Sequence, residues 1–235
     1  MNNSPEIKTD SKAVKWLDNF WYHYKWQTIG IVFAAFVLLV CVLQMCGKES
    51  VDVYVMYAGE DTFTDDEKLG NIKSALKSVL PEDCNGDGKK YVEWVSNYVL
   101  SDDDVKKMTE DGGEVNASLL SENDKRFRNL VLAGEYFVCF LSPYAYETVK
   151  EADGFMPLAE ILDKVPESAI DEYGILLKDT EFGSYYPGVS DLPDDTILCL
   201  RRKGSLGALL RKKSNEKNYE NSLVLFRAIV NFQNK

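Results

Sequence analysis

Histidine is almost absent from this chain of 235 residues, and the single copy is His23. Residues 47–235 therefore contain none, which argues there against Ser-His and Cys-His nucleophile pairs and against the usual zinc sites. The chain also lacks a G-x-S-x-G motif and a glycine-rich phosphate loop. Residues 74–77 match S-x-x-K, but the K-T-G and S-D-N elements that accompany it in serine acyl enzymes are missing. We expect a protein that is not an enzyme.

One long apolar run is present, at Thr28–Met45, where 18 residues carry no charge. Together with Trp26, Gln27 and Cys46, the run covers residues 26–46. A helix of this length is about 30 Å long, which is the thickness of a bilayer core. A buried helix of a soluble protein is rarely apolar on every face for this length. A cleaved signal peptide is the other alternative, but the run is longer than a usual signal-peptide core and no small-residue cleavage site follows. The sequence predicts an uncleaved transmembrane helix at 26–46.

The charges beside this run predict its orientation. Four lysines precede it, whereas only Lys48, next to Glu49, follows it closely. By the positive-inside rule, residues 1–25 form a cytoplasmic lead-in at the membrane interface, and residues 47–235 lie outside the cell. The aromatic residues of "NFWYHYKW", at 19–26, are typical of a membrane interface. We expect a single-pass protein of the cell membrane, with the lipid bilayer as a partner and an extracellular C-terminal domain.

The outer part is acidic and poor in cysteine. Of the chain's 27 basic and 38 acidic residues, 4 and 3 lie in residues 1–46, so residues 47–235 hold 23 and 35 and carry a net charge of −12. This balance argues against a nucleic acid as partner. Its three cysteines are an odd number and imply no disulfide framework. Cys139 and Cys199 lie in apolar runs and are interpreted as small core residues. An extracellular domain with so few cysteines is typical of a bacterial cell surface of the Gram-positive type.

Residues 47–235 read as alternating strands and helices. Period-2 apolar runs predict strands at 51–57, 89–100, 135–141 and 194–202. Helical spacing and capping residues predict helices at 64–80, 101–108, 121–134, 142–149, 157–162 and 219–232. Thr64 with Glu67, and Ser121 with Asp124, have capping spacing. Strands separated by helices predict one layered α/β domain with a mostly parallel sheet.

Two stretches carry a resemblance to a known family. The helix that leads into "AGEYFVCFLSPYAYE" at 133–147, followed by "DGFMPLAEIL" at 153–162, resembles part of a type 2 bacterial solute-binding protein. The likeness covers about residues 51–165 and implies an extracytoplasmic ligand-binding domain. The "NFWYHYKW" lead-in is similar to that of a group of uncharacterised membrane-anchored bacterial proteins.

The stretch "DCNGDGKK" at 83–90 resembles the first half of a calcium loop. Asp83, Asn85, Asp87 and Gly88 occupy positions 1, 3, 5 and 6, but Trp94 stands at position 12, where a glutamate is needed. The other interpretation is a tight turn rich in turn residues, which we favour. If calcium binds at all, the incomplete ligand set implies weak affinity. No other cofactor is expected.

Two further segments are candidate contact surfaces. Glu181, Tyr185 and Tyr186 begin a stretch, 181–193, whose tyrosines and glycines suit a ligand or partner; alternatively its tyrosines pack on their own domain. Residues 201–217 hold seven basic residues and one acid, so Arg211, Lys212 and Lys213 are candidates for contact with anionic lipid. The alternative is a solvated linker.

Together these patterns suggest a membrane-anchored extracytoplasmic domain that binds a small ligand or a membrane-protein partner without catalysis. The alternative is a solute-binding accessory component of a membrane transporter.

The predicted topology has a direct test. Because lysines concentrate before the apolar run, we expect a tag fused after Lys235 to lie outside the cell, attached to an uncleaved anchor. Protease added to intact spheroplasts should remove this tag and leave an N-terminal tag intact. A protected C-terminal tag would reverse the assignment.

Overall fold

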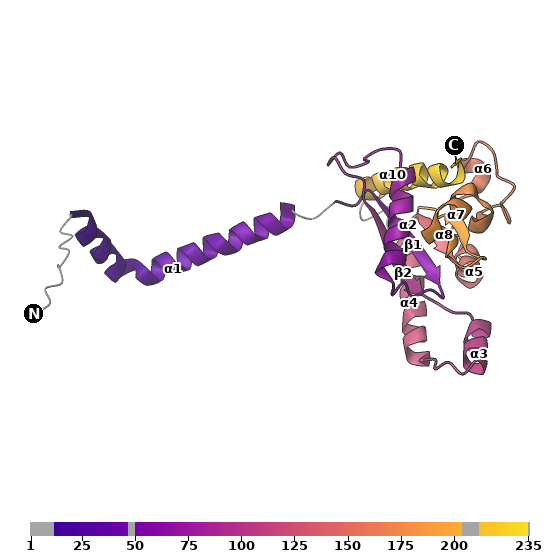
Figure 1. Cartoon of the computed structure of the whole chain (residues 1–235), viewed down its shortest axis with the longest axis horizontal. Helices are drawn as coiled ribbons and strands as arrows, with labels where there is room; N and C mark the ends of the chain where they lie inside the picture. The colour runs from indigo at the N-terminus through magenta and orange to yellow at the C-terminus, as the bar shows by residue number, and fades with distance from the viewer. Residues whose placement is uncertain (1–11, 47–49, 204–211, 235) are drawn as a thin grey trace, which may run out of the picture. The chain divides into compact units, whose positions relative to one another are not determined.

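The structure, a computed structural model, describes residues 12–46, 50–203 and 212–234. The chain divides into two compact units, with the boundary between Glu49 and Ser50. The first contains the helix α1 (Lys12–Cys46), and the second contains every strand and the other helices of the described part (Figure 1). Each unit is described by itself.

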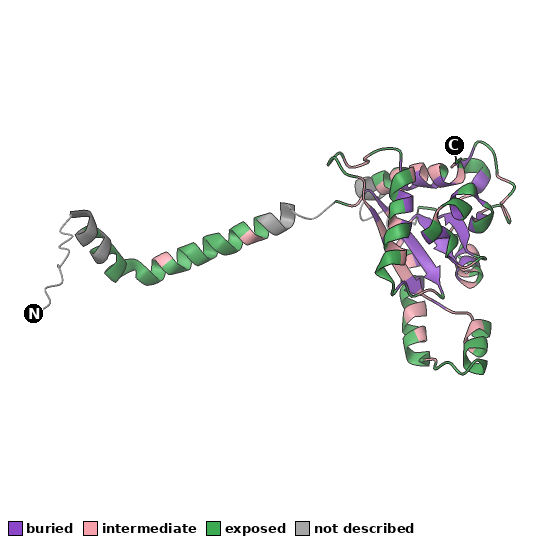
Figure 2. Cartoon of the chain, in the orientation of Figure 1, coloured by how far each residue is buried: buried purple, intermediate pink, exposed green. Residues whose placement is uncertain are grey.

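The helix α1 is long and apolar enough to be a membrane span or a signal sequence. Its apolar segment, Asn19–Val42, has a mean hydropathy of 2.0. Most of its described side chains are exposed (Figure 2). Trp16, Phe20 and Tyr24 form a row of rings on one helix face, with centroids 5.6 and 5.3 Å apart. The lead-in and the apolar run are thus one continuous helix.

The second unit is built on a five-stranded sheet in the order β2-β1-β3-β5-β4. The strands are β1 (Val53–Gly59), β2 (Val92–Tyr98), β3 (Val138–Leu141), β4 (Gly174–Leu176) and β5 (Ile197–Leu200). Strand β1 pairs in parallel with both β2 and β3, whereas β5 is antiparallel to its neighbours β3 and β4. The sheet is therefore mixed and only partly parallel. The expectation of a mostly parallel sheet was wrong for two of the four strand pairings.

Strand β4 is absent from the sequence-based prediction. It has only three residues, and a run this short has no detectable alternation. Its pairing partner β5 holds it in the sheet, through the register from Gly174 opposite Cys199 to Leu176 opposite Ile197. This edge strand is a product of tertiary pairing and not of local sequence preference.

Helices cover both faces of the sheet. They are α2 (Asp66–Val79), α3 (Asp102–Glu110), α4 (Ala117–Ala133), α5 (Pro143–Glu151), α6 (Leu158–Ile161), the 3-10 helix η1 (Leu177–Asp179), α7 (Glu181–Tyr185), α8 (Pro187–Ser190) and α10 (Lys212–Val230). Predicted helices match α2, α3, α5 and α6 closely. The C-terminal helix begins earlier than expected, and α4 begins after Asn116, whose side chain accepts a hydrogen bond from Leu119 N. Likewise Asp65, not Thr64, caps α2.

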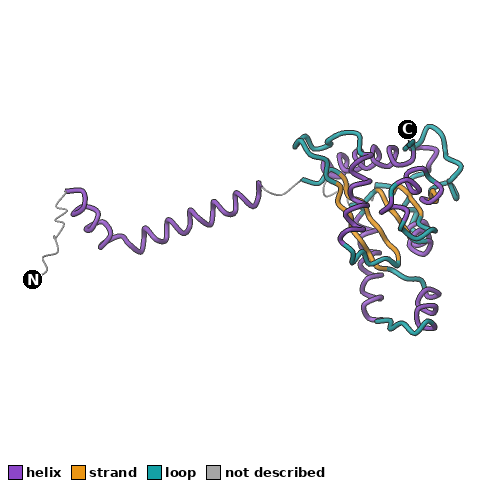
Figure 3. Tube along the Cα trace, viewed as in Figure 1, coloured by secondary structure: helices purple, strands orange, loops and turns teal. Residues whose placement is uncertain are grey.

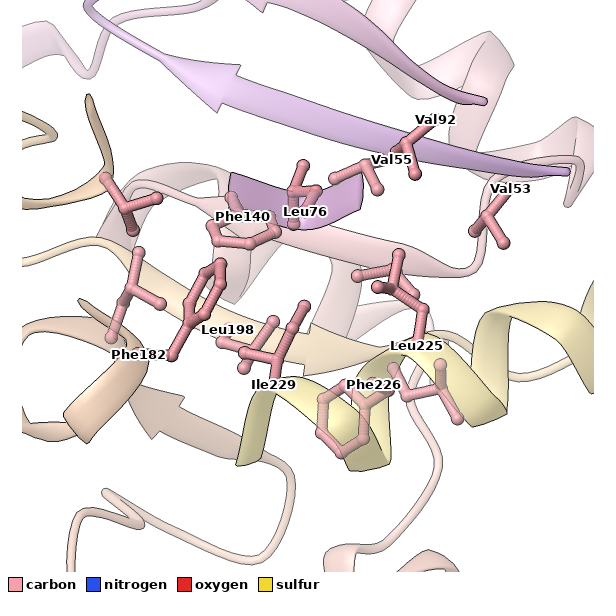
Figure 4. Close-up of a cluster of buried hydrophobic side chains, with 14 of the residues drawn as sticks. Val53, Val55, Leu76, Val92, Phe140, Phe182, Leu198, Leu225, Phe226 and Ile229 are labelled. Atoms are coloured by element: carbon pink, nitrogen blue, oxygen red, sulfur yellow. The ribbon is translucent and has the colours of Figure 1, made fainter. Parts of the chain in front are cut away.

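The alternation of β1 explains why two helical layers are needed. Val53, Val55 and Tyr57 point to one face and belong to a core cluster that includes side chains of α2 and α10. Figure 4 shows Val53 and Val55 in this cluster. Met56 and Ala58 point to the other face, where α4 and α5 supply the core. Because both faces of this strand are buried, each must be covered by helices, which gives a three-layer α/β/α domain.

Helix α3 and the first half of α4 extend beyond the ends of the strands (Figure 3). None of the nine residues of α3 is buried. The helix depends instead on local interactions at its start: the Ser101 hydroxyl accepts from Asp104 N at 3.1 Å, and the Asp104 carboxylate accepts from Ser101 N at 3.1 Å. This capping box fixes where α3 begins, and the sequence predicted a capped helix at this place.

A polar network ties α5 to the loop before β4. The Asp171 carboxylate accepts hydrogen bonds from Tyr146 Oη at 2.6 Å, Lys150 Nζ at 2.7 Å and the backbone N of Tyr173 and Gly174 at 2.8 and 3.0 Å. Although partial burial acts in the opposite direction, these donors lower the pKa of Asp171 to about 2. The ionised carboxylate therefore stabilises the folded state.

We expect Asp171→Asn to destabilise the domain at pH 7 by on the order of 1 kcal/mol, because water screens this partly exposed site. Since the pKa of Asp171 is lower in the folded state, its contribution is present above about pH 4 and is lost as the pH falls toward 2. Thermal unfolding of both proteins between pH 7 and pH 2 should therefore show a difference that shrinks with acid. A difference independent of pH would show that the charge is not involved.

Candidate functional site

A cleft of about 490 Å³ lies at one edge of the sheet. Its lining residues come from strand β1, from the loops after β1, β2 and β3, from the loop before β5 and from helices α3 and α5: Tyr57, Glu60, Val99, Ser101, Asp103, Asp104, Lys107, Ser142, Pro143, Tyr144, Glu147, Pro193, Asp195 and Thr196. A cavity of this size accommodates a small-molecule ligand.

The strand order explains why the cleft lies here. After β1 the chain passes through α2 to β2, which pairs with one edge of β1. It then returns through α3 and α4 to β3, which pairs with the other edge of β1. Helices α2 and α4 therefore leave the sheet edge toward opposite faces, as their separate cores show. In open α/β sheets, such a switch point leaves a crevice outside the carboxyl ends of the strands, where ligands bind.

Two helices begin at the cleft because the sequence places capping residues directly after two strands. Ser101 follows β2 and caps α3, while Ser142 follows β3 and caps α5 by accepting a hydrogen bond from Ala145 N at 3.4 Å. Pro143 occupies the first turn of α5, where a missing N–H costs nothing. Backbone pairing holds the second cap in place, since Ser142 N donates to Ala58 O at 2.8 Å.

Tyr57 of β1 forms the floor of the cleft and is only 1% exposed. Its ring stacks on Trp94 and meets the edge of Phe63, at centroid distances of 5.7 and 4.7 Å. Its hydroxyl oxygen accepts a hydrogen bond from Asp61 N at 3.3 Å. Burial, together with nearby carboxylates, raises the pKa of Tyr57 far above its ordinary value, so the hydroxyl keeps its proton.

Gly59 makes room for this hydroxyl. A Cβ at Gly59 would lie 2.6 Å from the Tyr57 hydroxyl oxygen and 3.4 Å from the Ser142 Cβ. The phenol therefore ends beside the backbone of Gly59, next to the cap of α5, where β1 and β3 both end. Any larger residue at position 59 would displace the Tyr57 ring from this place.

The charged side chains of the lining are mostly acidic. Five carboxylates, from Glu60, Asp103, Asp104, Glu147 and Asp195, face a single ammonium group, from Lys107. Within residues 12–46, 50–203 and 212–234, no three histidine, cysteine, aspartate or glutamate side chains are grouped so that they could hold a metal ion. The arrangement is suited to binding through charge and hydrogen bonds.

The residues suggested as a calcium loop lie at the opposite, amino end of β1, in the connection from α2 to β2. The Asp83 carboxylate accepts backbone hydrogen bonds from Asn85, Gly86 and Gly88 at 3.1, 2.7 and 2.6 Å. Asp87 accepts from Lys89 N and from the Ser50 hydroxyl, both at 2.9 Å. These carboxylates thus bind the turn's own donors, which supports the turn interpretation.

The buried Asp52 anchors this turn to the sheet. Its carboxylate accepts from Asn85 N at 2.9 Å and from Tyr91 N at 2.8 Å, on either side of the turn. Gly86 and Gly88 both have positive φ, 82° and 84°, a conformation that glycine adopts without strain. The composition that resembles a metal loop is therefore also what this backbone path requires.

Residues Glu181, Tyr185 and Tyr186 lie on α7 and at its end, and not in an irregular loop. Tyr186 packs between Phe182 and Phe232 and accepts a hydrogen bond from the Ser78 hydroxyl at 2.8 Å. Glu181 accepts from Asn234 N at 3.0 Å. Tyr185 is half exposed but also contacts Phe232. These contacts favour packing on the domain itself. None of the three residues lines the large cleft, which the stretch 181–193 reaches only with Pro193.

The basic segment at 201–217 is described only in part. Arg211 lies outside the described residues, as do the side chains of Lys212 and Lys213, which are in the first turn of α10. At its other end, Arg201 is 3% exposed, and its guanidinium donates to the carbonyl oxygens of Leu130 and Val131 in the last turn of α4. Arg201 therefore caps a helix and is not available to lipid.

Sequence reasoning named none of the cleft residues as ligand-binding, although it identified both helices that begin there. The available signal was the position of Ser101 and Ser142 directly after predicted strands. Strand order, which brings these loops together, cannot be read from one sequence. No family model matches the chain, and no curated protein or solved structure is significantly similar to it.

The turn interpretation predicts the effect of removing both carboxylates. Although burial acts in the opposite direction, backbone donors lower the pKa of Asp83, so the ionised side chain holds the turn. Asp83→Ala combined with Asp87→Ala should lower the melting temperature by a few degrees without preventing folding. Calorimetry should show no calcium affinity tighter than about millimolar in the parent chain. Tight binding that the double variant loses would establish a calcium site instead.

Proposed function

We propose that this protein is a single-pass membrane protein whose extracytoplasmic α/β domain binds a small ligand in the cleft at the carboxyl ends of β1, β2 and β3. The observation that carries this proposal is the cleft itself: its volume of about 490 Å³ suits a small molecule, and it lies at the strand-order switch point of the sheet. The apolar helix α1 supports membrane attachment, with the flanking lysines placing the domain outside the cell.

The proposed activity is binding without catalysis. The hydroxyls of Ser101 and Ser142, which line the cleft, are engaged as helix caps. Tyr57 is held in its protonated form. A domain that binds a small ligand at the membrane surface has two uses: it reports on the ligand to a membrane partner, or it delivers the ligand to a transporter. The size of the cleft is compatible with the second use, which also fits the resemblance to part of a solute-binding protein.

The cleft is tested by filling it. Lys107 lines the cleft from the exposed face of α3, whereas the exposed Lys77 of α2 does not line it. Thermal unfolding of the full chain in lipid nanodiscs is screened against amino acids, short peptides, sugars and Ca²⁺. A ligand at about 100 times its dissociation constant should stabilise by about 2.7 kcal/mol, which raises the melting temperature by about 5–10 °C.

Lys107→Trp should weaken the binding of such a ligand at least about tenfold, because the indole occupies part of the cleft. The control Lys77→Trp, at an exposed position of α2 that does not line the cleft, should leave the affinity unchanged. Equal binding by both variants would place the ligand elsewhere and contradict the proposed site. Ligand-independent capture of one membrane protein, unaffected by Lys107→Trp, would favour a partner-binding domain without a small ligand.

A further inference from the structure

We propose, as an extension of the proposed function, that the cleft selects a small ligand that carries both an ammonium group and an oxygen acceptor. Amino acids, amino sugars and the amino end of a short peptide have this chemistry. The inference depends on three features: which of the lining carboxylates lack a counter-ion, where the buried Tyr57 hydroxyl points, and what occupies the helix ends at the cleft.

Three of the five lining carboxylates already have partners. Asp103 forms an ion pair with Lys106 at 2.9 Å, and Glu147 lies 3.7 Å from Lys150. Asp104 is engaged in the capping box with Ser101. These three side chains therefore have roles in the fold that need no ligand.

Glu60 and Asp195 have no such role. In the part of the chain that the structure describes, neither makes an ion pair or a hydrogen bond. Glu60 directly follows β1, and Asp195 precedes β5, so the two carboxylates approach the cleft from separate strands. Both are near enough to the floor to act electrostatically on the Tyr57 hydroxyl. Both side chains are exposed and line one cavity, so an ammonium group bound there can donate hydrogen bonds to either carboxylate without displacing a protein cation.

The second half of the ligand is indicated by Tyr57. The hydroxyl oxygen is an acceptor for Asp61 N, but among the described residues nothing accepts the hydroxyl proton. The side chain is 1% exposed and lines the cleft, and its oxygen lies over Gly59 beside Ser142. A buried hydroxyl normally finds an acceptor. A carboxylate, carbonyl or hydroxyl oxygen of a bound ligand would supply it.

The helix N-termini at the cleft do not make it a binding site for anions. A helix N-terminus usually favours a negative ligand, but α3 has three aspartates in its first turn, Asp102, Asp103 and Asp104. The side chain of Ser142 already occupies the cap position of α5, whose first residue, Pro143, has no N–H to offer. The protein's own acids and caps therefore satisfy these ends, and the remaining charge of the cleft is negative.

The test compares matched pairs of probes on the full chain in nanodiscs. Isothermal titration is run with alanine methyl ester, glucosamine and the dipeptide amide Ala-Ala-NH2, beside uncharged counterparts in which the single amine is acetylated or replaced by hydroxyl. We expect at least one amine to bind, and its uncharged counterpart to bind at least about tenfold more weakly, since charged hydrogen bonds are the stronger ones.

Variants then locate the contacts. Glu60→Gln and Asp195→Asn should each weaken the amine about tenfold, and Tyr57→Phe about threefold to tenfold, with little change for the uncharged probes in the first two. Asp163→Asn removes an exposed acid away from the cleft and serves as the control for a general loss of negative charge. Far-UV circular dichroism and thermal unfolding confirm that each variant is folded.

The outcomes separate this inference from the proposed function. Binding of acetylated or anionic probes that Lys107→Trp blocks but Glu60→Gln does not affect would leave the cleft as a binding site and overturn the ammonium assignment. If Asp163→Asn weakens amine binding as much as Glu60→Gln does, the attraction is a nonspecific effect of negative charge. This result would also overturn the ammonium assignment. Absence of binding by every amine would overturn it too, and a ligand that Lys107→Trp does not affect would overturn the proposed function.

Discussion

The parallel pairing of β1 with both β2 and β3 is the constraint on which the rest of this domain depends. A strand paired in parallel on both sides must be reached by crossover connections, and here one crossover covers each face. The same arrangement buries both faces of β1 and brings the loops after β1, β2 and β3 to one edge. The core and the cleft are therefore two consequences of one strand order.

The elements predicted well are those with strong local signals. Ser101 with Asp104, and Ser142 with Pro143, mark helix starts through hydrogen bonds made within four residues, and the structure begins α3 and α5 there. The central strands β1 and β3 were recognised from their apolar, β-branched and aromatic runs. Where two candidates compete within one turn, the sequence did not choose correctly: Asp65 rather than Thr64 caps α2, because its carboxylate reaches Glu67 N at 2.8 Å.

The features that were missed depend on long-range partners. Arg201 reads as part of a solvated basic segment, yet it is buried against the end of α4, more than sixty residues earlier in the chain. Cys139 and Cys199 read as unrelated core residues, yet β3 and β5 place them opposite each other in register. Their thiols are close enough that burial and the neighbouring thiol raise the pKa of Cys199. Neither relationship leaves a trace in local composition, because each is created by sheet order.

The acidic character of the cleft has a double origin. Helices that start at the carboxyl edge of a sheet favour carboxylates in their first turns, so part of the negative charge at this edge is a consequence of helix capping. Asp103 and Asp104 are explained in this way, and the sequence alone supports that interpretation of aspartate runs. Glu60 and Asp195 differ, since they follow or precede strands, cap no helix and lack a counter-ion in the described structure. Charge that the fold requires and charge that it does not are thus separable residue by residue. Glu60 and Asp195 belong to the second group, and they line the same cleft as the buried Tyr57 hydroxyl, whose proton has no acceptor among the described residues. These groups are the ones that a ligand would recognise.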